Sequence, residues 1–227
     1  MSVICPTILA HTAEEFSEQQ DVIASIARQS SLDRHSDKSP RDDGFRVQID
    51  LTDGEFAEPK TINLNQIYWP DNWTVDLHLM FREPTKWTEA LVSLNPHLVI
   101  VHAEAEGDLP ALAEHLHKFG IKVGIALLPG TTVDSVKNFI KFFDHALIFG
   151  GHLGMQGGVA DLSNLEKVHK VLAINPDIEI GWDGGANVDN IAEIAAAGVD
   201  VINVGAAIAK ADNPTEAYHG LNMLVIQ

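Results

Sequence analysis

The sequence predicts an α/β protein built as a single parallel (β/α)8 barrel, the TIM-barrel architecture, occupying residues 1–227 as one domain. Three observations support this prediction. Eight short apolar runs recur along the chain, amphipathic stretches separate most of them, and ionisable residues directly follow several runs. Eight strand–helix units in 227 residues suit one closed barrel, and a doubly wound open sheet is the structural alternative.

The apolar runs are the predicted strands. Each is short and mainly apolar, as expected of a strand that is buried on both faces of a parallel sheet. In chain order they cover residues 2–9, 46–51, 74–80, 97–102, 122–128, 145–150, 178–183 and 200–205.

Helix start and stop signals lie between the runs. Thr12 with Glu15, and Asn213 with Glu216, fit capping boxes at the start of a helix. Gly120 lies where a helix should end before the next strand. These signals favour helices as the connections between parallel strands.

One segment interrupts the alternation. Residues 28–44, RQSSLDRHSDKSPRDDG, are polar and charged and contain almost no large apolar side chain. Such a composition predicts a surface insertion between the first helix and the second strand. A lid or a partner-docking loop is the alternative interpretation.

Composition and charge exclude several classes of protein. The formal net charge of −17 argues against a nucleic-acid partner, because such binding depends on lysine and arginine contacts with phosphates. The single cysteine, Cys5, excludes an intramolecular disulfide and suits a reducing compartment. No run approaches the roughly 18 apolar residues of a membrane span, and the first residues lack the basic region of a signal peptide. We therefore expect a cytoplasmic protein that contacts neither nucleic acid nor membrane.

Ionisable residues gather at the ends of different predicted strands. In a parallel barrel these ends lie at the same rim, where the chemistry of the fold takes place. Two carboxylates and a histidine on different strands, Asp50, Asp183 and His78, form a candidate mononuclear metal site with nitrogen and oxygen ligands. Other ionisable residues at strand ends are Asp53, His102 and Glu104.

Glycine-rich segments follow the last three predicted strands. They cover residues 150–158, 183–185 and 203–207. In barrels this region commonly holds a phosphate on backbone N–H groups. All five arginines precede residue 83, so a phosphate site here would use lysines or backbone amides.

Several motifs together resemble the ribulose-phosphate 3-epimerase family. The segments ICPTILA, QIDLTDGEF, DLHLM, VHAEA, GIALLPGTT, WDGGAN and AGVDVINVGAAI occur in the order of that family, and the resemblance covers most of residues 4–209. It implies an epimerase that inverts C3 of a phosphorylated ketopentose, such as ribulose 5-phosphate, through an enediolate. It also implies that Asp50 and Asp183 are the acid–base pair and bind a divalent metal, zinc, manganese or iron, together with His78.

The resemblance also assigns substrate-binding positions and reveals departures. The implied substrate-binding residues are Thr7, His78, Met80, Gly154, Gly157, Gly185, Gly205 and Ala206, with phosphate on amides near the last three. Gln48 replaces a metal-ligating histidine and offers one amide oxygen, a weaker donor than imidazole nitrogen. Thr7 replaces a serine, and Thr52 and Phe149 replace two methionines that cover the enediolate.

These departures leave two alternatives. An epimerase of a ketohexose 6-phosphate would suit pocket walls altered by Thr52 and Phe149. A non-catalytic phosphosugar-binding barrel would suit a metal site weakened by Gln48, although such a protein has little reason to keep buried charges. The expected partners are a phosphorylated sugar and further copies of the chain in a homo-oligomer.

Overall fold

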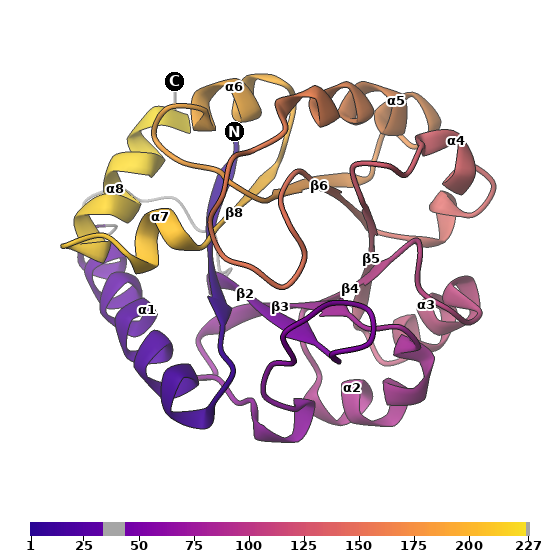
Figure 1. The fold of residues 1–227 in the computed structure, drawn as a ribbon, viewed down its shortest axis with the longest axis horizontal. Helices are drawn as coiled ribbons and strands as arrows, with labels where there is room; N and C mark the ends of the chain where they lie inside the picture. Colours follow the sequence, from indigo (N-terminus) through magenta and orange to yellow (C-terminus); the bar gives the residue numbers. More distant parts are fainter. Residues whose placement is uncertain (34–43, 226–227) are drawn as a thin grey trace.

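Eight parallel strands close into a barrel in the computed structural model, which describes residues 1–33 and 44–225. Each strand pairs with the next along the chain, and the eighth pairs with the first. Figure 1 shows the helices around the outside of the strands. The predicted fold class is confirmed, with strands β1 (Val3–Leu9), β2 (Phe45–Thr52), β3 (Trp73–Met80), β4 (Leu98–His102), β5 (Lys122–Leu127), β6 (His145–Phe149), β7 (Glu179–Asp183) and β8 (Val201–Val204).

The helices begin where the capping residues predict. Thr12 Oγ1 accepts a hydrogen bond from the backbone N–H of Glu15 at 3.1 Å, directly before the first helix. Asn213 Oδ1 accepts one from the N–H of Glu216 at 3.3 Å, before the last helix. The helices are α1 (Ala13–Asp33), α2 (Thr88–Leu94), α3 (Leu109–His117), α4 (Val133–Val136), α5 (Glu166–Ile174), α6 (Ile191–Ala196), α7 (Ala206–Ala209) and α8 (Pro214–Val225). Within the described ranges, none is long and apolar enough to cross a membrane.

The connection after β2 departs from the strand–helix alternation. Residues 53–72 contain a single 3-10 turn, Leu64–Gln66, and no α-helix. Gly54, Pro59 and Pro70 lie in this segment, and proline removes a backbone donor and blocks a continuous helix. The loop therefore replaces one of the eight expected helices.

The polar segment at residues 28–44 is partly helical, which corrects the prediction of an insertion that starts after the first helix. Helix α1 continues to Asp33, because residues 28–33 contain neither glycine nor proline to end it. Residues 34–43 lie outside the described residues. The expectation of a lid or docking loop there stays a prediction.

The barrel interior is apolar on one side and polar on the other. Leu98, Ile100, Ala126 and Leu147 form an apolar cluster on β4, β5 and β6. Buried polar side chains, by contrast, come mainly from β1, β2, β3 and β8. A larger apolar core packs the helices against the outside of the strands. The fold thus gathers its polar groups into one half of the barrel.

Candidate active site at the barrel mouth

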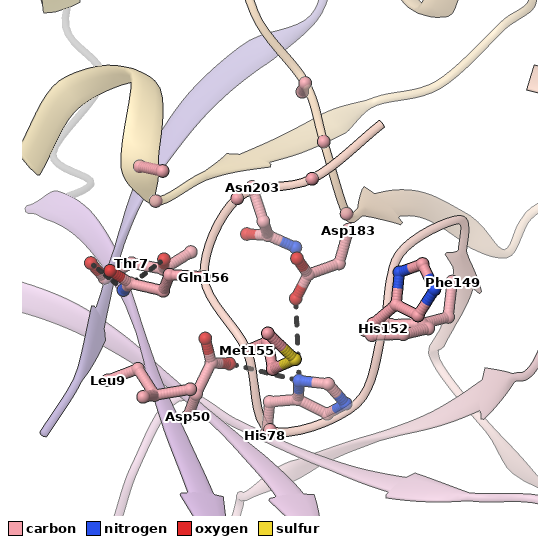
Figure 2. Close-up of a pocket in the computed structure, with 18 of the residues that line it drawn as sticks. Thr7, Leu9, Asp50, His78, Phe149, His152, Met155, Gln156, Asp183 and Asn203 are labelled. Atoms are coloured by element: carbon pink, nitrogen blue, oxygen red, sulfur yellow. Dashed lines mark hydrogen bonds and ion pairs between the residues drawn. The ribbon is translucent and has the colours of Figure 1, made fainter. Parts of the chain in front are cut away.

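Asp50, His78 and Asp183 converge at the carboxyl ends of β2, β3 and β7. His78 Nδ1 lies 3.1 Å from Asp50 Oδ1 and 3.5 Å from Asp183 Oδ2 (Figure 2). The three side chains present one nitrogen and two oxygen atoms within 4.8 Å of one another. Parallel pairing brings Asp50 opposite His78, since they are register partners on neighbouring strands. The candidate metal-binding residues predicted from the sequence therefore lie together.

Gln48 lies beneath this group and contacts both carboxylates. Its Nε2 donates hydrogen bonds to Asp50 Oδ1 at 2.7 Å and to Asp183 Oδ2 at 2.6 Å. Its Oε1 is buried and has no hydrogen-bond partner among the described residues. The amide thus stabilises two neighbouring carboxylates and leaves one buried oxygen unused.

The local electrostatics favour a shared proton or a cation. Burial and the charge of Asp183 raise the pKa of Asp50 above its ordinary value, against the effect of its hydrogen bond with His78. Burial disfavours the imidazolium of His78, but hydrogen bonds with Asp183 and Asp50 outweigh it and raise the pKa of His78 to about 9. Among the residues that the structure describes, no lysine or arginine lines the pocket above these three side chains. Two carboxylates therefore share one imidazole.

These residues fit a divalent metal. Carboxylate oxygen and imidazole nitrogen are donors that zinc, manganese and iron accept. A half-turn of the Gln48 amide would exchange its Nε2 and Oε1, so the unused oxygen can serve as a fourth, weaker ligand. Two neighbouring carboxylates, an imidazole nitrogen and an unpaired amide oxygen are more stable around a bound cation than without one.

A cavity of about 280 Å³ opens above the three residues. Figure 1 shows the segment after β6 lying across the barrel opening. The cavity wall includes the following positions expected from the sequence: Thr7, Asp50, His78, Met80, Gly154, Gly157, Asp183, Gly185, Gly205 and Ala206. Gln48 does not line the cavity, because it lies below Asp50 and Asp183.

Phe149 and Thr52 were both expected on the pocket wall, but only one of them lies there. Phe149 lines the pocket, and its ring centroid lies 6.0 Å from that of His78. Thr52 is buried outside the lining, and its hydroxyl donates to the carbonyl of Pro59. The expectation that Thr52 alters the wall is wrong, because a hydrogen bond within the loop after β2 holds its side chain.

Several pocket residues were not predicted. Leu9, His152, Gln156, Asn187 and Asn203 line the cavity, and Gln156 Nε2 donates to Thr7 Oγ1 at 3.4 Å. His152 and Gln156 belong to the glycine-rich segment 150–158, which the sequence already associated with the substrate. Asn203 is a polar residue in an apolar strand, a signal that could have identified it.

The remaining ionisable residues at strand ends have different surroundings. Asp53 accepts hydrogen bonds from the N–H groups of Glu55, Phe56 and Arg82, and so holds a turn. His102 Nε2 lies 2.9 Å from His78 Nε2. Burial lowers the pKa of His102 to about 4, which makes it neutral near pH 7. Of these residues, only His102 contacts the three central side chains directly.

Comparisons with known proteins identify the family of the chain. The model of the ribulose-phosphate 3 epimerase family matches residues 22–209. The chain is 29% identical to a ribulose-phosphate 3-epimerase of Mycobacterium leprae, over 96% of this chain and 93% of the relative. It is 30% identical to one from Mycobacterium bovis, over 77% and 80%.

A solved structure supports the fold alone. The 3-hexulose-6-phosphate synthase from Salmonella typhimurium superposes with a TM-score of 0.67 at 14% identity, covering 100% of this chain and 99% of the other. The family match spans most of the barrel and includes all three converging residues. The chain therefore belongs to the ribulose-phosphate 3-epimerase family and is a carbohydrate epimerase.

Proposed function

We propose that this epimerase inverts C3 of a phosphorylated ketopentose and interconverts ribulose 5-phosphate and xylulose 5-phosphate. One observation carries the proposal. Carboxylates from two different strands, Asp50 and Asp183, lie at the floor of one pocket within 3.5 Å of the same nitrogen of His78. Such a pair can reach a carbon between them from two sides, as inversion requires.

The two carboxylates divide the proton transfer. One takes the C3 proton, and the other, in its protonated form, gives a proton to the opposite face of C3. The raised pKa of Asp50 suits the protonated partner, because burial and the charge of Asp183 disfavour its ionised form. Asp183, which is more exposed, suits the base. In the reverse reaction the two residues exchange roles.

Asp50, His78 and Asp183 would hold the divalent metal, with Gln48 as a weaker fourth donor. When bound, the metal supplies positive charge that stabilises an enediolate. Leu9, Met80 and Phe149 give the pocket an apolar side that keeps water from the reacting carbon.

The substrate phosphate would rest on backbone amides near Gly185, Gly205 and Ala206. All three residues line the pocket, and no lysine or arginine of residues 1–33 and 44–225 belongs to its lining. Gly185 has φ of +69°, and a Cβ there would overlap the backbone of Ala160. Only glycine therefore fits between the pocket and the backbone of Ala160. The expected homo-oligomer and cytoplasmic location stay predictions.

Only one of the two substitutions that suggested a hexose reaches the pocket, which favours the pentose. The alternative of a ketohexose 6-phosphate depended on walls altered by Thr52 and Phe149. Only Phe149 reaches the pocket, while Thr52 is held by the loop after β2. No enlargement from Thr52 therefore supports the longer substrate.

Asparagine substitutions test the acid–base pair. Asp183→Asn and Asp50→Asn should each lower turnover of ribulose 5-phosphate at least about 100-fold, because an amide cannot transfer the proton. Both should also slow deuterium entry from solvent at C3. Asp189→Asn is the matched control, since this exposed carboxylate lies on the same loop as Asp183 but outside the pocket.

Near-normal turnover in either pocket variant would remove that residue from the pair. The same assay with unphosphorylated ribulose tests the phosphate cradle. We expect a large loss of kcat/KM for that sugar. Equal values for the two sugars would place the phosphate outside the site.

A further inference from the structure

A row of three side chains leads away from the converging carboxylates. His78 and His102 are fully buried, and their Nε2 atoms lie 2.9 Å apart. On the far side of His102, Nδ1 lies 3.4 Å from Glu104 Oε2. The row therefore runs from the metal-binding group, through β4, to the loop that follows β4.

Only one hydrogen can lie between the two imidazole nitrogens. If His102 donates it, His78 Nε2 must be bare, and His78 Nδ1 carries a hydrogen that blocks metal binding. If His78 donates it, His78 Nδ1 can be bare and can face the space between Asp50 and Asp183. The tautomer of His102 therefore decides which nitrogen of His78 the site receives.

Glu104 settles this choice. Its Oε1 accepts hydrogen bonds from the Thr131 hydroxyl and from the N–H of Leu128 at 3.2 Å, which fix the carboxylate in place. Although burial opposes the charge, hydrogen bonds from His102 and Thr131 lower the pKa of Glu104. An ionised carboxylate only accepts, so Glu104 favours a hydrogen on His102 Nδ1, the ring nitrogen that faces it.

The contact between His102 and Glu104 has no competitor among the residues that the structure describes. The 3.4 Å separation is longer than an ordinary hydrogen bond, and His102 Nδ1 and Glu104 Oε2 are both buried with no hydrogen-bond partner among the described residues, so each is the nearest partner available to the other. The rings of Phe56 and Phe149 pack against His102, with centroids 4.9 and 6.0 Å away. This packing keeps the imidazole from turning away from Glu104.

We propose that Glu104 is a positioning residue that holds His102 in its Nδ1–H tautomer, so that His78 donates Nε2–H to His102 and presents Nδ1 to Asp50 and Asp183. The use of that nitrogen as a metal ligand rests on the proposed function, whereas the tautomer itself does not. Residues outside the ligand shell that fix a ligating histidine in this way typically contribute about 10- to 100-fold to metal affinity.

Nitrogen NMR of the full-length, metal-free protein labelled with ¹⁵N-histidine tests the tautomer. In the wild type, His102 should show a protonated Nδ1 and a bare Nε2. In Glu104→Gln this preference should weaken or reverse, because an amide can either donate or accept. Glu106→Gln is the control, since it removes one nearby carboxylate whose side chain is 62% exposed and pairs with Arg82 at the surface.

Titration calorimetry with Mn²⁺ alone tests the consequence. Glu104→Gln should bind Mn²⁺ about 10- to 100-fold more weakly than the wild type, and Glu106→Gln should match the wild type. A wild-type His102 that is protonated on Nε2, or equal Mn²⁺ affinity in Glu104→Gln, would overturn the proposal. If the protein shows the expected tautomer and Mn²⁺ affinities but does not turn over ribulose 5-phosphate, the proposed function is wrong and the role of Glu104 stands.

Discussion

The barrel interior contains two polar layers on the same three strands, and only one of them is electrostatically complete. The lower layer lies toward the amino ends of β2, β3 and β7 and comprises Arg46, Asp76 and Glu179, with His145 of β6. The upper layer lies toward their carboxyl ends and comprises Gln48, Asp50, His78 and Asp183. β2, β3 and β7 each contribute to both layers, so the layers differ in their side chains and not in the strands that carry them.

In the lower layer every carboxylate has a cationic partner. Arg46 Nε lies 2.7 Å from Asp76 Oδ2, and its two terminal nitrogens each lie 2.8 Å from an oxygen of Glu179. Although burial opposes the charge, hydrogen bonding with Glu179 and the charge of Asp76 raise the pKa of Arg46. The guanidinium, which comes from β2, thus links its neighbour β3 to β7.

The upper layer contains no arginine or lysine, and its one basic side chain among the described residues is the imidazole of His78. Two carboxylates there depend on the Gln48 amide and on one imidazole. The comparison teaches that Arg46 compensates both carboxylates of the lower layer, whereas the two carboxylates of the upper layer share one imidazole. The lower layer therefore needs no ligand, and the upper layer suits the divalent metal that we propose there.

Removing Arg46 should give the largest effect. Arg46→Met leaves Asp76 and Glu179 without their buried partner and should lower the free energy of unfolding by about 3–5 kcal/mol, measured by urea denaturation. Asp50→Asn in the metal-free protein is the matched change in the upper layer. It should leave the unfolding free energy unchanged or raise it, because it removes one of two buried carboxylates that share a single imidazole and repel each other. Comparable losses in both variants would contradict the distinction between the layers.

Adding a ligand to the upper layer should give an intermediate effect. Gln48→His places an imidazole between Asp50 and Asp183 and should raise zinc or manganese affinity about tenfold, provided that the ring is oriented by a neighbouring hydrogen bond. Mass spectrometry of metal content, alongside turnover under equal metal supply, measures both consequences.

The control for this change is Gln48→Asn, which keeps an amide but shortens the side chain. Unchanged metal occupancy in Gln48→His, together with an active, metal-free wild type, would contradict the metal-assisted mechanism. Gln48 would then be a hydrogen-bond donor to the enediolate oxygens.

The smallest effect should appear as a pH dependence of stability in the lower layer. Although burial opposes it, hydrogen bonds with Arg46 and His145 hold the pKa of Glu179 well below its ordinary value of 4.5. A lowered folded-state pKa means that this contribution is present above pH 4.5 and is lost as the pH falls below it. The Glu179 side chain is 36% exposed, so solvent weakens the effect.

Glu179→Gln should therefore make the unfolding free energy less dependent on pH below 4.5 than in the wild type. Urea denaturation at a series of acidic pH values measures both slopes. Glu166→Gln, a change at an exposed helical pair with Lys170, should keep more of the wild-type slope. A Glu179→Gln slope as steep as that of the wild type would show that the Arg46 pair does not shift this titration.

The sequence by itself determined the eight strands, their order and the residues at the rim of the barrel. Strand alternation is a local property, so it placed Asp50 and His78 inward on β2 and β3 without knowledge of the rest of the chain. Closure of the barrel then brought Asp183 to them, as the predicted architecture required. The motifs also identified the family before any geometry was available.

Only the tertiary structure decided which polar side chains meet. The sequence placed Gln48 beside Asp50, but it did not indicate that the amide would donate to both carboxylates or that Thr52 would turn toward Pro59. The pairing of Arg46 with Glu179 joins residues 133 positions apart. Such contacts depend on the register and closure of the whole barrel, which decide which donors lie within hydrogen-bond distance of a buried acceptor. Local periodicity carries none of this information, because it fixes the face of a strand on which a side chain lies but not the partner it finds there.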